Sequence, residues 1–105
     1  MVNVVFYLEK GDYCGFSSIG HAEFDNCGKD IVCSAISSVI VGGINALENI
    51  KNFDVIIETG NVKCVKKENC VLTTNDKIVL KTIRIQLETI KESKPKNISI
   101  REERI

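Results

Sequence analysis

Apolar residues occupy every second position in residues 2–8, the spacing of a β-strand with one buried face. Residues 9–12 include a glycine that can adopt a positive φ, so they predict a hairpin turn. A second strand is predicted over residues 13–21. Gly15 and Gly20 interrupt it and indicate a bulge or the close approach of another backbone. The chain is therefore expected to begin with an antiparallel hairpin.

A helix is predicted next. Residues 23–28 are mostly polar and should form a loop, after which apolar residues recur every three or four positions as far as Leu47. The helix is expected to begin between Gly28 and Asp30, with Asp30 as its N-cap or as an acid in its first turn. Each glycine of the pair Gly42–Gly43 costs about 1 kcal/mol relative to alanine, so this pair indicates a point of close packing.

The second half of the chain repeats this order. Short strands are predicted over residues 53–58 and 62–66, joined by a turn at 59–61 that contains a glycine. A last strand is predicted over residues 98–101, where isoleucines alternate with polar residues.

A second helix should lie between these strands. The polar residues 73–76 are typical of a helix N-terminus, and Pro95 should end the helix. Its predicted buried stripe consists of Val79, Ile83, Leu87 and Ile90. The element order is ββαββαβ, which predicts an α+β fold. We expect a two-layer sandwich in which a mostly antiparallel sheet carries both helices on one face.

Length and charge limit the possible functions. The 105 residues suffice for a single domain, residues 1–105. Fourteen basic and fourteen acidic residues cancel, whereas nucleic-acid-binding domains usually carry a basic excess, so no direct nucleic-acid contact is expected. The apolar start lacks the basic residues of a signal peptide, and residues 35–47 are too short and too polar to span a membrane. A soluble cytoplasmic protein is expected, with no membrane partner.

The cysteines indicate reduced thiols. They number five, an odd count in a chain without an export signal, which is not typical of a disulfide framework. No Cys-x-x-Cys pair occurs, and the spacings do not match structural zinc sites. Neither a metal nor another cofactor is expected.

Cys33 is the first candidate for chemistry. It is expected in the first turn of the first helix, where free backbone N–H groups and the helix dipole favour a thiolate over a thiol. On a helical wheel it lies beside the buried stripe and shares a face with Ser37 and Val41. The alternative is a buried cysteine that acts as a small hydrophobic residue.

His21 is the only histidine, and it stands at the predicted end of the second strand. An imidazole there could accept the proton of Cys33 and return it to a leaving amine. The alternative is a surface histidine that ends a strand. Asp30 could cap the helix or orient His21. Ser37 could be a neutral helix serine or a hydrogen-bond partner in the pocket.

These candidates belong to one run of residues with fixed spacing: Gly20-His21-Ala22, Gly28-x-Asp30-Ile31-Val32-Cys33-Ser34-Ala35, Ser37 and Asn45-x-Leu47. The run resembles the ribosomal-processing cysteine protease family, Prp. Length and element order fit the family over the whole chain, and the specific motif covers residues 20–47. Gly20 and Gly28 of this motif are expected to shape the substrate-binding surface beside His21 and Cys33.

The resemblance implies a small dimeric bacterial endopeptidase. In this family the substrate is the precursor of large-subunit ribosomal protein number twenty-seven, which loses an N-terminal extension after a hydrophobic, phenylalanine-rich motif ending in a small residue. The family's catalytic dyad falls on His21 and Cys33, and its supporting residues fall on Asp30 and Ser37. Cys27 departs from the family pattern, which leaves the dyad intact and the redox behaviour of the loop open.

The sequence leaves two functional hypotheses. In the first, Cys33 attacks a scissile carbonyl, N–H groups at the start of the first helix stabilise the oxyanion, and residues 23–29 close over an extended substrate. In the second, the chain is a non-enzymatic ribosome-associated assembly protein whose sheet binds a partner segment. Thiol reactivity discriminates between them, because only a catalytic Cys33 should alkylate well before the other cysteines.

Overall fold

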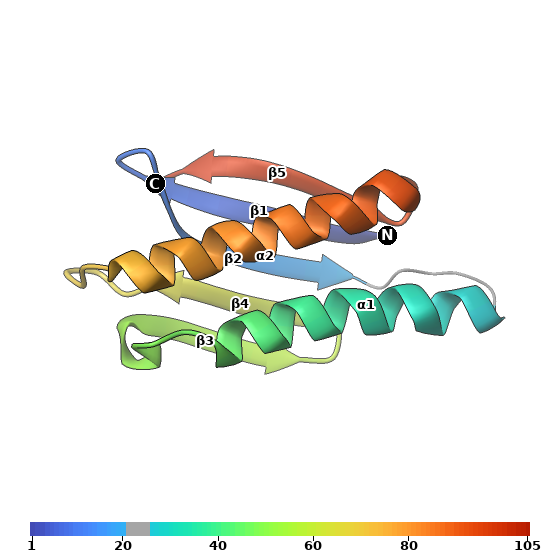
Figure 1. The fold of residues 1–105 in the computed structure, drawn as a ribbon, viewed down its shortest axis with the longest axis horizontal. Helices are drawn as coiled ribbons and strands as arrows, with labels where there is room; N and C mark the ends of the chain where they lie inside the picture. Colours follow the sequence, from blue (N-terminus) through green and yellow to red (C-terminus); the bar gives the residue numbers. More distant parts are fainter. Residues whose placement is uncertain (21–25) are drawn as a thin grey trace.

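The computed structural model describes residues 1–20 and 26–105, with the side chains of residues 26–30 excepted. The elements, in chain order, are β1 (Val2–Glu9), β2 (Asp12–Gly20), α1 (Asn26–Asn45), a 3-10 turn η1 (Ile50–Asn52), β3 (Phe53–Glu58), β4 (Asn61–Lys66), α2 (Thr74–Ser93) and β5 (Ile98–Arg104). Figure 1 shows α1 and α2 lying side by side along the strands. No helix in the described part of the chain is both long enough and apolar enough to cross a membrane.

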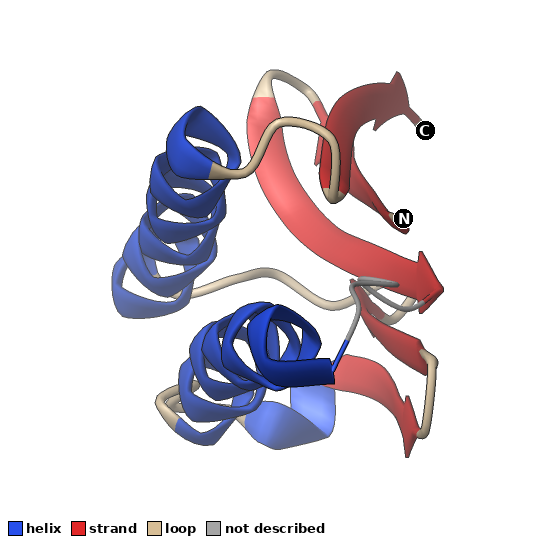
Figure 2. Cartoon of the chain, turned by 90° about the vertical axis from the view of Figure 1, so that its right-hand side faces the viewer, coloured by secondary structure: helices blue, strands red, loops and turns tan. Residues whose placement is uncertain are grey.

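The strands form one sheet in the order β3-β4-β2-β1-β5. Every neighbouring pair is antiparallel except β1 and β5, which run parallel. Both helices cover the same face of the sheet, as Figure 2 shows from the end of the molecule. The predicted α+β sandwich is therefore confirmed, with its ββαββαβ order.

The β1–β2 hairpin has the predicted turn, in which Lys10 and Gly11 adopt φ values of 53° and 85°. Two positive φ values match the right-handed twist of the flanking strands. Gly15 follows a shift in the register of this hairpin. A Cβ on Gly15 would lie 2.5 Å from the carbonyl oxygen of Cys64, so the predicted bulge and close approach are both confirmed.

The core lies between the sheet and the two helices. Phe6 and Phe16, from β1 and β2, are fully buried with ring centroids 5.5 Å apart. The buried stripe of α1 consists of Val32, Ile36, Ile40 and Ile44. Gly43 lies directly against the side chain of Ile83 in α2, which confirms close packing there, whereas Gly42 has open space around it. The prediction for Gly42 was wrong.

The start of α1 differs from the prediction. The helix begins at Asn26, so Gly28 and Asp30 lie within it, and no acidic residue occupies its first turn. Asp30 is therefore not the N-cap. Most helical stability in proteins comes from packing of an apolar face, so a helix can extend beyond a favourable capping residue.

The N-terminus of α2 is held more firmly than its sequence indicates. Thr73 is the N-cap and accepts a hydrogen bond from the Asp76 N–H at 3.1 Å, within the stretch 73–76 predicted to start the helix. The Asp76 carboxylate, which is completely buried, accepts hydrogen bonds from the N–H groups of Glu48 (2.7 Å) and Asn49 (3.2 Å). Asp76 thus connects the chain that leaves α1 to the start of α2.

The buried stripe of α2 also needs a correction. Ile83 and Leu87 are buried as predicted, but the stripe includes Leu80, while Val79 and Ile90 are only half-buried. The helical period defines a face several residues wide and does not fix its centre.

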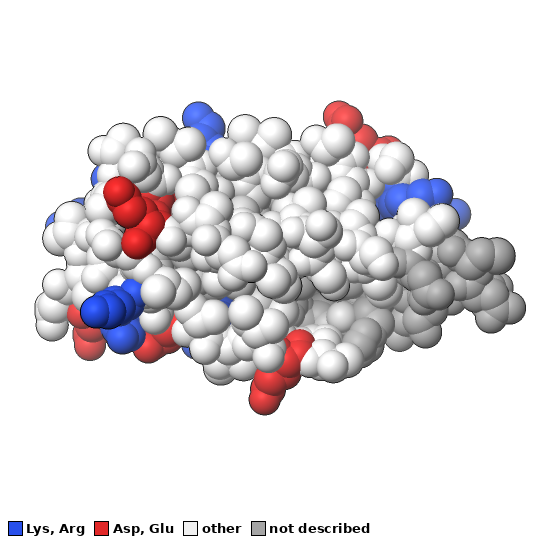
Figure 3. Space-filling view, turned by 60° about the horizontal axis from the view of Figure 1, so that its bottom comes forward, with Lys and Arg blue, Asp and Glu red and all other residues white. Residues whose placement is uncertain are grey.

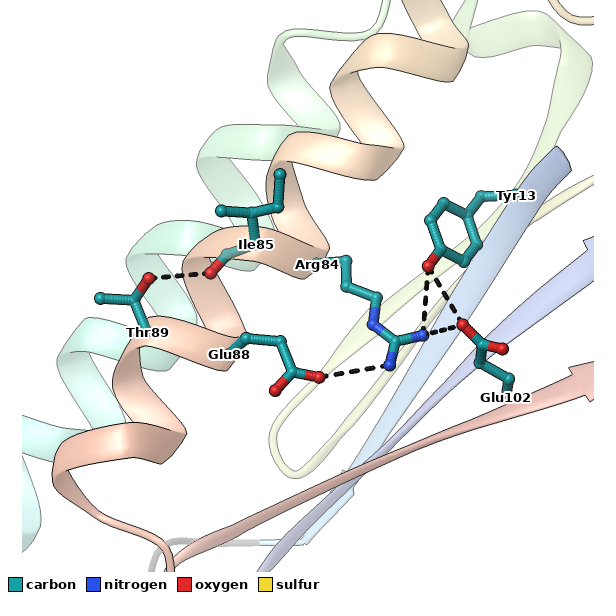
Figure 4. A network of polar contacts seen from close by, with 6 residues as sticks. All are labelled: Tyr13, Arg84, Ile85, Glu88, Thr89 and Glu102. Carbon is teal, nitrogen blue, oxygen red and sulfur yellow. Dashed lines mark hydrogen bonds and ion pairs between the residues drawn. The ribbon is translucent and has the colours of Figure 1, made fainter.

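The final strand is longer than predicted, because it continues to Arg104. Glu102 from this extension pairs with Arg84 of α2 and accepts a hydrogen bond from the Tyr13 hydroxyl (Figure 4). Arg84 also pairs with Glu88 at 3.2 Å. Burial and the bond to Glu102 raise the pKa of Tyr13. The network fastens the end of β5 to α2.

Candidate active site

A groove of about 510 Å³ lies between α1 and the end of the sheet where β2 ends and the β3–β4 hairpin turns. Its described lining residues are Val2, Ser18, Gly20, Cys33, Ile36, Ser37, Ile40, Val41, Ile57, Glu58, Thr59, Gly60, Asn61 and Val62. Glu58 is the only charged residue among them. Figure 3 shows the hollow below the middle of the molecule, on a face with few charged side chains. The groove can therefore accept an apolar segment of another chain.

Cys33 is the one thiol among the described residues that line this groove. It is half-buried and packs beside the core without belonging to the buried stripe. Because α1 begins at Asn26, Cys33 lies in the second turn and not in the predicted first turn. Its own N–H is thus inside the helix and is not one of the free N–H groups of a helix start. Two expectations rested on a first-turn position and lose that support. One was a thiolate stabilised by the helix dipole, and the other was the use of N–H groups at the helix start as oxyanion donors.

Ser37 and Val41 follow Cys33 on the same face of α1, and all three line the groove. The prediction from the helical wheel is confirmed on this point. Ser37 is exposed, so its hydroxyl can reach a bound molecule. The helix therefore presents a thiol, a hydroxyl and a branched apolar side chain in one row along the groove.

Gly20 marks the point where β2 ends in the groove. Its φ is 109°, and a Cβ at this position would collide with the carbonyl oxygen of Met1. Its N–H donates a hydrogen bond to the carbonyl oxygen of Gly60 at 3.0 Å. One backbone hydrogen bond thus connects the strand that leads to His21 with the turn that forms the opposite part of the groove.

If the groove is a catalytic site, Gly20→Ala should lower its kcat by about 100-fold, because a small misplacement of a reacting group has effects of this size. The added methyl group must displace either the end of β2 or Met1. Gly11→Ala is the matched control, since Gly11 also has a positive φ but open space around it. Both variants should lose about 1–3 kcal/mol of stability from backbone strain. Equal kcat values for the two variants would contradict a positioning role for Gly20.

Several predicted site residues lie outside what the structure describes. His21 and residues 23–25 of the expected closing loop are not described. The backbone of residues 26–30 is helical, but the side chains of Cys27 and Asp30 are not described. The groups brought together within the described residues are therefore Gly20, Cys33 and Ser37.

The other described cysteines have different surroundings. Burial raises the pKa of Cys64 to about 12, and burial also raises the pKa of Cys14, so both remain protonated thiols at neutral pH. Cys70 is half-buried in a smaller pocket beside Cys14, away from the groove. No cluster of three metal-binding side chains occurs among the residues with described positions.

The β3–β4 hairpin is the part of the groove that the sequence did not reveal. Ile57 and Val62 contribute apolar side chains, and the turn at Thr59 and Gly60 forms the rim. These residues follow the end of the motif by 10 to 15 positions and were predicted only as strand and turn. A signal existed in residues 55–57, which are apolar without interruption where a strand with one buried face would alternate.

The groove, its thiol and its apolar walls can be compared with known proteins. The family model for the cysteine protease Prp matches residues 1–99. The chain belongs to the Prp family. A ribosomal processing cysteine protease Prp from Mycoplasma genitalium is 40% identical over 87 residues, which cover 80% of this chain and 83% of that protein. The Staphylococcus aureus Prp is 32% identical over 89 residues, covering 77% and 78% of the two chains.

Solved structures agree with this Prp assignment. The crystal structure of the S. aureus ribosomal processing protease Prp with a covalently linked product peptide matches with a TM-score of 0.82 at 25% identity. The match covers 98% of this chain and 100% of that one. A second S. aureus Prp structure, with a substrate peptide, matches with a TM-score of 0.78, also at 25% identity, and covers 98% and 100% of the two chains. The Prp fold is therefore shared over nearly the whole length of both chains.

Proposed function

We propose that this Prp family member is an endopeptidase in which Cys33 is the nucleophile and His21 is the general base and acid. The observation that carries the proposal is the position of Cys33, half-buried in an apolar groove beside the strand end that leads to His21. The covalently linked product peptide of the S. aureus relative supports a covalent route.

The proposed chemistry proceeds in two steps. His21 takes the proton of the Cys33 thiol, and the sulfur attacks the scissile carbonyl carbon. The C–N bond breaks, His21 gives the proton to the leaving amine, and the acyl group remains on sulfur as a thioester. In the second step His21 takes a proton from water, and the water oxygen attacks the thioester carbon. The C–S bond breaks, the acid leaves, and His21 returns the proton to the Cys33 sulfur.

The proposed substrate is the precursor of large-subunit ribosomal protein number twenty-seven, cut to remove its N-terminal extension. The apolar walls of the groove suit the hydrophobic, phenylalanine-rich motif expected before the cleavage point. Asp30 and Ser37 are proposed as supporting residues, with Gly20 and Gly28 shaping the surroundings. We also propose that the protein is a cytoplasmic homodimer and needs no metal or other cofactor.

Incubation of the protein with a peptide that covers the precursor's extension tests this function. Mass spectrometry should find one cut, directly after the hydrophobic motif, and a peptide with that motif scrambled should remain intact. In parallel, iodoacetamide should modify Cys33 before the buried Cys14 and Cys64. No cleavage together with an unreactive Cys33 would favour the non-enzymatic assembly protein.

We expect His21→Ala to lower kcat by about 1,000-fold, within the range typical of a lost general base. Binding of the peptide should change little, because an extended groove does not need the base to hold its ligand. The pH–rate profile of the wild-type protein should contain a limb that the variant lacks. If binding and turnover fell together, His21 would have a structural role.

A further inference from the structure

The strand β3 lies at one edge of the sheet and pairs only with β4 among the described strands. The β3–β4 hairpin has a two-residue loop, which Glu58 and Asn61 close as a pair. In such a hairpin the closing pair is hydrogen-bonded. Along the strands from there, hydrogen-bonded and non-hydrogen-bonded pairs alternate. The hydrogen bond from the Lys67 N–H to the Asn52 carbonyl, at 2.8 Å, fits this alternation at the other end of the strand.

The alternation determines which backbone groups of β3 point away from the sheet. Val55 and Ile57 form the non-hydrogen-bonded pairs with β4, so their N–H and C=O groups point to the open edge. Phe53 has the same orientation, but its N–H donates to the Ile50 carbonyl in η1. Val55 and Ile57 thus offer two donors and two acceptors for one more strand.

The open edge is continuous with the groove. The Ile57 side chain lines the groove, and residues directly opposite each other in a sheet project to the same face. An added residue opposite Ile57 would therefore direct its side chain toward the groove. The side chains of its neighbours would point to the helix-free face, so only every second side chain of an added strand would contact the groove.

The middle of the edge, between the charged Asp54 and Glu58, lacks the usual features that prevent strand addition. Residues 55–57 are three successive β-branched apolar residues, with no lysine, proline or bulge among them. Ile56 and Ile57 remain 42% and 52% exposed. The middle of this strand is suited to pairing with an extended apolar chain.

From this edge we infer that the substrate binds by strand addition: an extended segment next to the scissile bond pairs with Val55 and Ile57 of β3. Alternate side chains then enter the groove beside Cys33. The inference rests on the proposed function and adds the binding mode. Main-chain hydrogen bonds supply affinity, and the groove selects side chains at every second position.

A backbone N-methyl scan of the precursor peptide tests strand addition. Binding is measured to the Cys33→Ala variant, which should hold the peptide without cutting it. Methylation should weaken binding by about 5- to 10-fold at every second position of the paired segment, where an N–H donor is lost, and little at the positions between. The neighbouring positions of the same peptide are the matched control.

If the wild-type protein cleaves the peptide but methylation weakens binding equally at all positions, strand addition is overturned and the proposed function stands. A peptide that is neither bound nor cut would overturn both. The edge could instead pair with a second copy of this chain. In that case Ile56→Lys, which changes the helix-free face and leaves the groove intact, should shift sedimentation toward the monomer, and the peptide scan should be flat.

Discussion

Cys33→Ala should abolish cleavage of the precursor peptide, with a loss of about 10⁴-fold or more, the scale typical of removing a catalytic nucleophile. The fold should survive, because Cys33 is half-buried beside the buried stripe and alanine is the best helix former. Cys33→Ser should be equally inactive, since an alcohol is much less acidic than a thiol and forms its nucleophilic anion far less readily.

The measurement is the single-turnover rate of peptide cleavage, with circular dichroism to show that the helices remain. Cys70→Ala is the control, because Cys70 is also half-buried but lies in a different pocket. It should cleave at the wild-type rate. Cleavage by Cys33→Ala within a few-fold of wild type would disprove the nucleophile assignment.

Asp76→Ala should lower the free energy of unfolding by about 3 kcal/mol, the largest stability loss we expect from one polar side chain here. The substitution leaves the N–H groups of Glu48 and Asn49 without their acceptors and removes a carboxylate from the first turn of α2. Typical domains have only about 5–15 kcal/mol of stability, so this loss is a large fraction.

Urea denaturation measures this loss. Thr73→Ala, which removes only the N-cap hydroxyl, should cost about 1 kcal/mol. Asp76→Asn should fall between the two, because its amide keeps one oxygen acceptor. A loss below that of Thr73→Ala would show that the bonds from Glu48 and Asn49 contribute little.

Thr73 and Asp76 show which contacts of the fold the sequence could predict and which it could not. The capping stretch 73–76 was visible in the sequence, because the hydrogen bond between Thr73 and Asp76 depends on residues three positions apart. The partners of Asp76 come from a loop 28 and 27 positions earlier in the chain, and no local pattern indicates them. Tertiary contacts of this kind require the packing of α1 against α2 to be known.

The candidate site likewise combines features that the local sequence predicts with features that depend on the tertiary fold. The helical period placed Cys33, Ser37 and Val41 on one face, and the structure puts that face in the groove. The position of Cys33 along the helix was wrong, because capping signals near Asp30 suggested a later start than Asn26. The hairpin wall around Ile57 was missed, because its place depends on the order of strands in the sheet, which periodicity does not define.

The parallel pairing of β5 with β1 has a consequence for how the chain reaches its native state. The pairing joins residues up to 96 positions apart, such as Asn3 and Ser99, so it closes one of the longest loops available to this chain. Such non-local contacts slow folding. During synthesis β1 must wait for the last strand, with its apolar edge uncovered until residues 98–104 have left the ribosome. This interval is when the nascent chain is most exposed to aggregation.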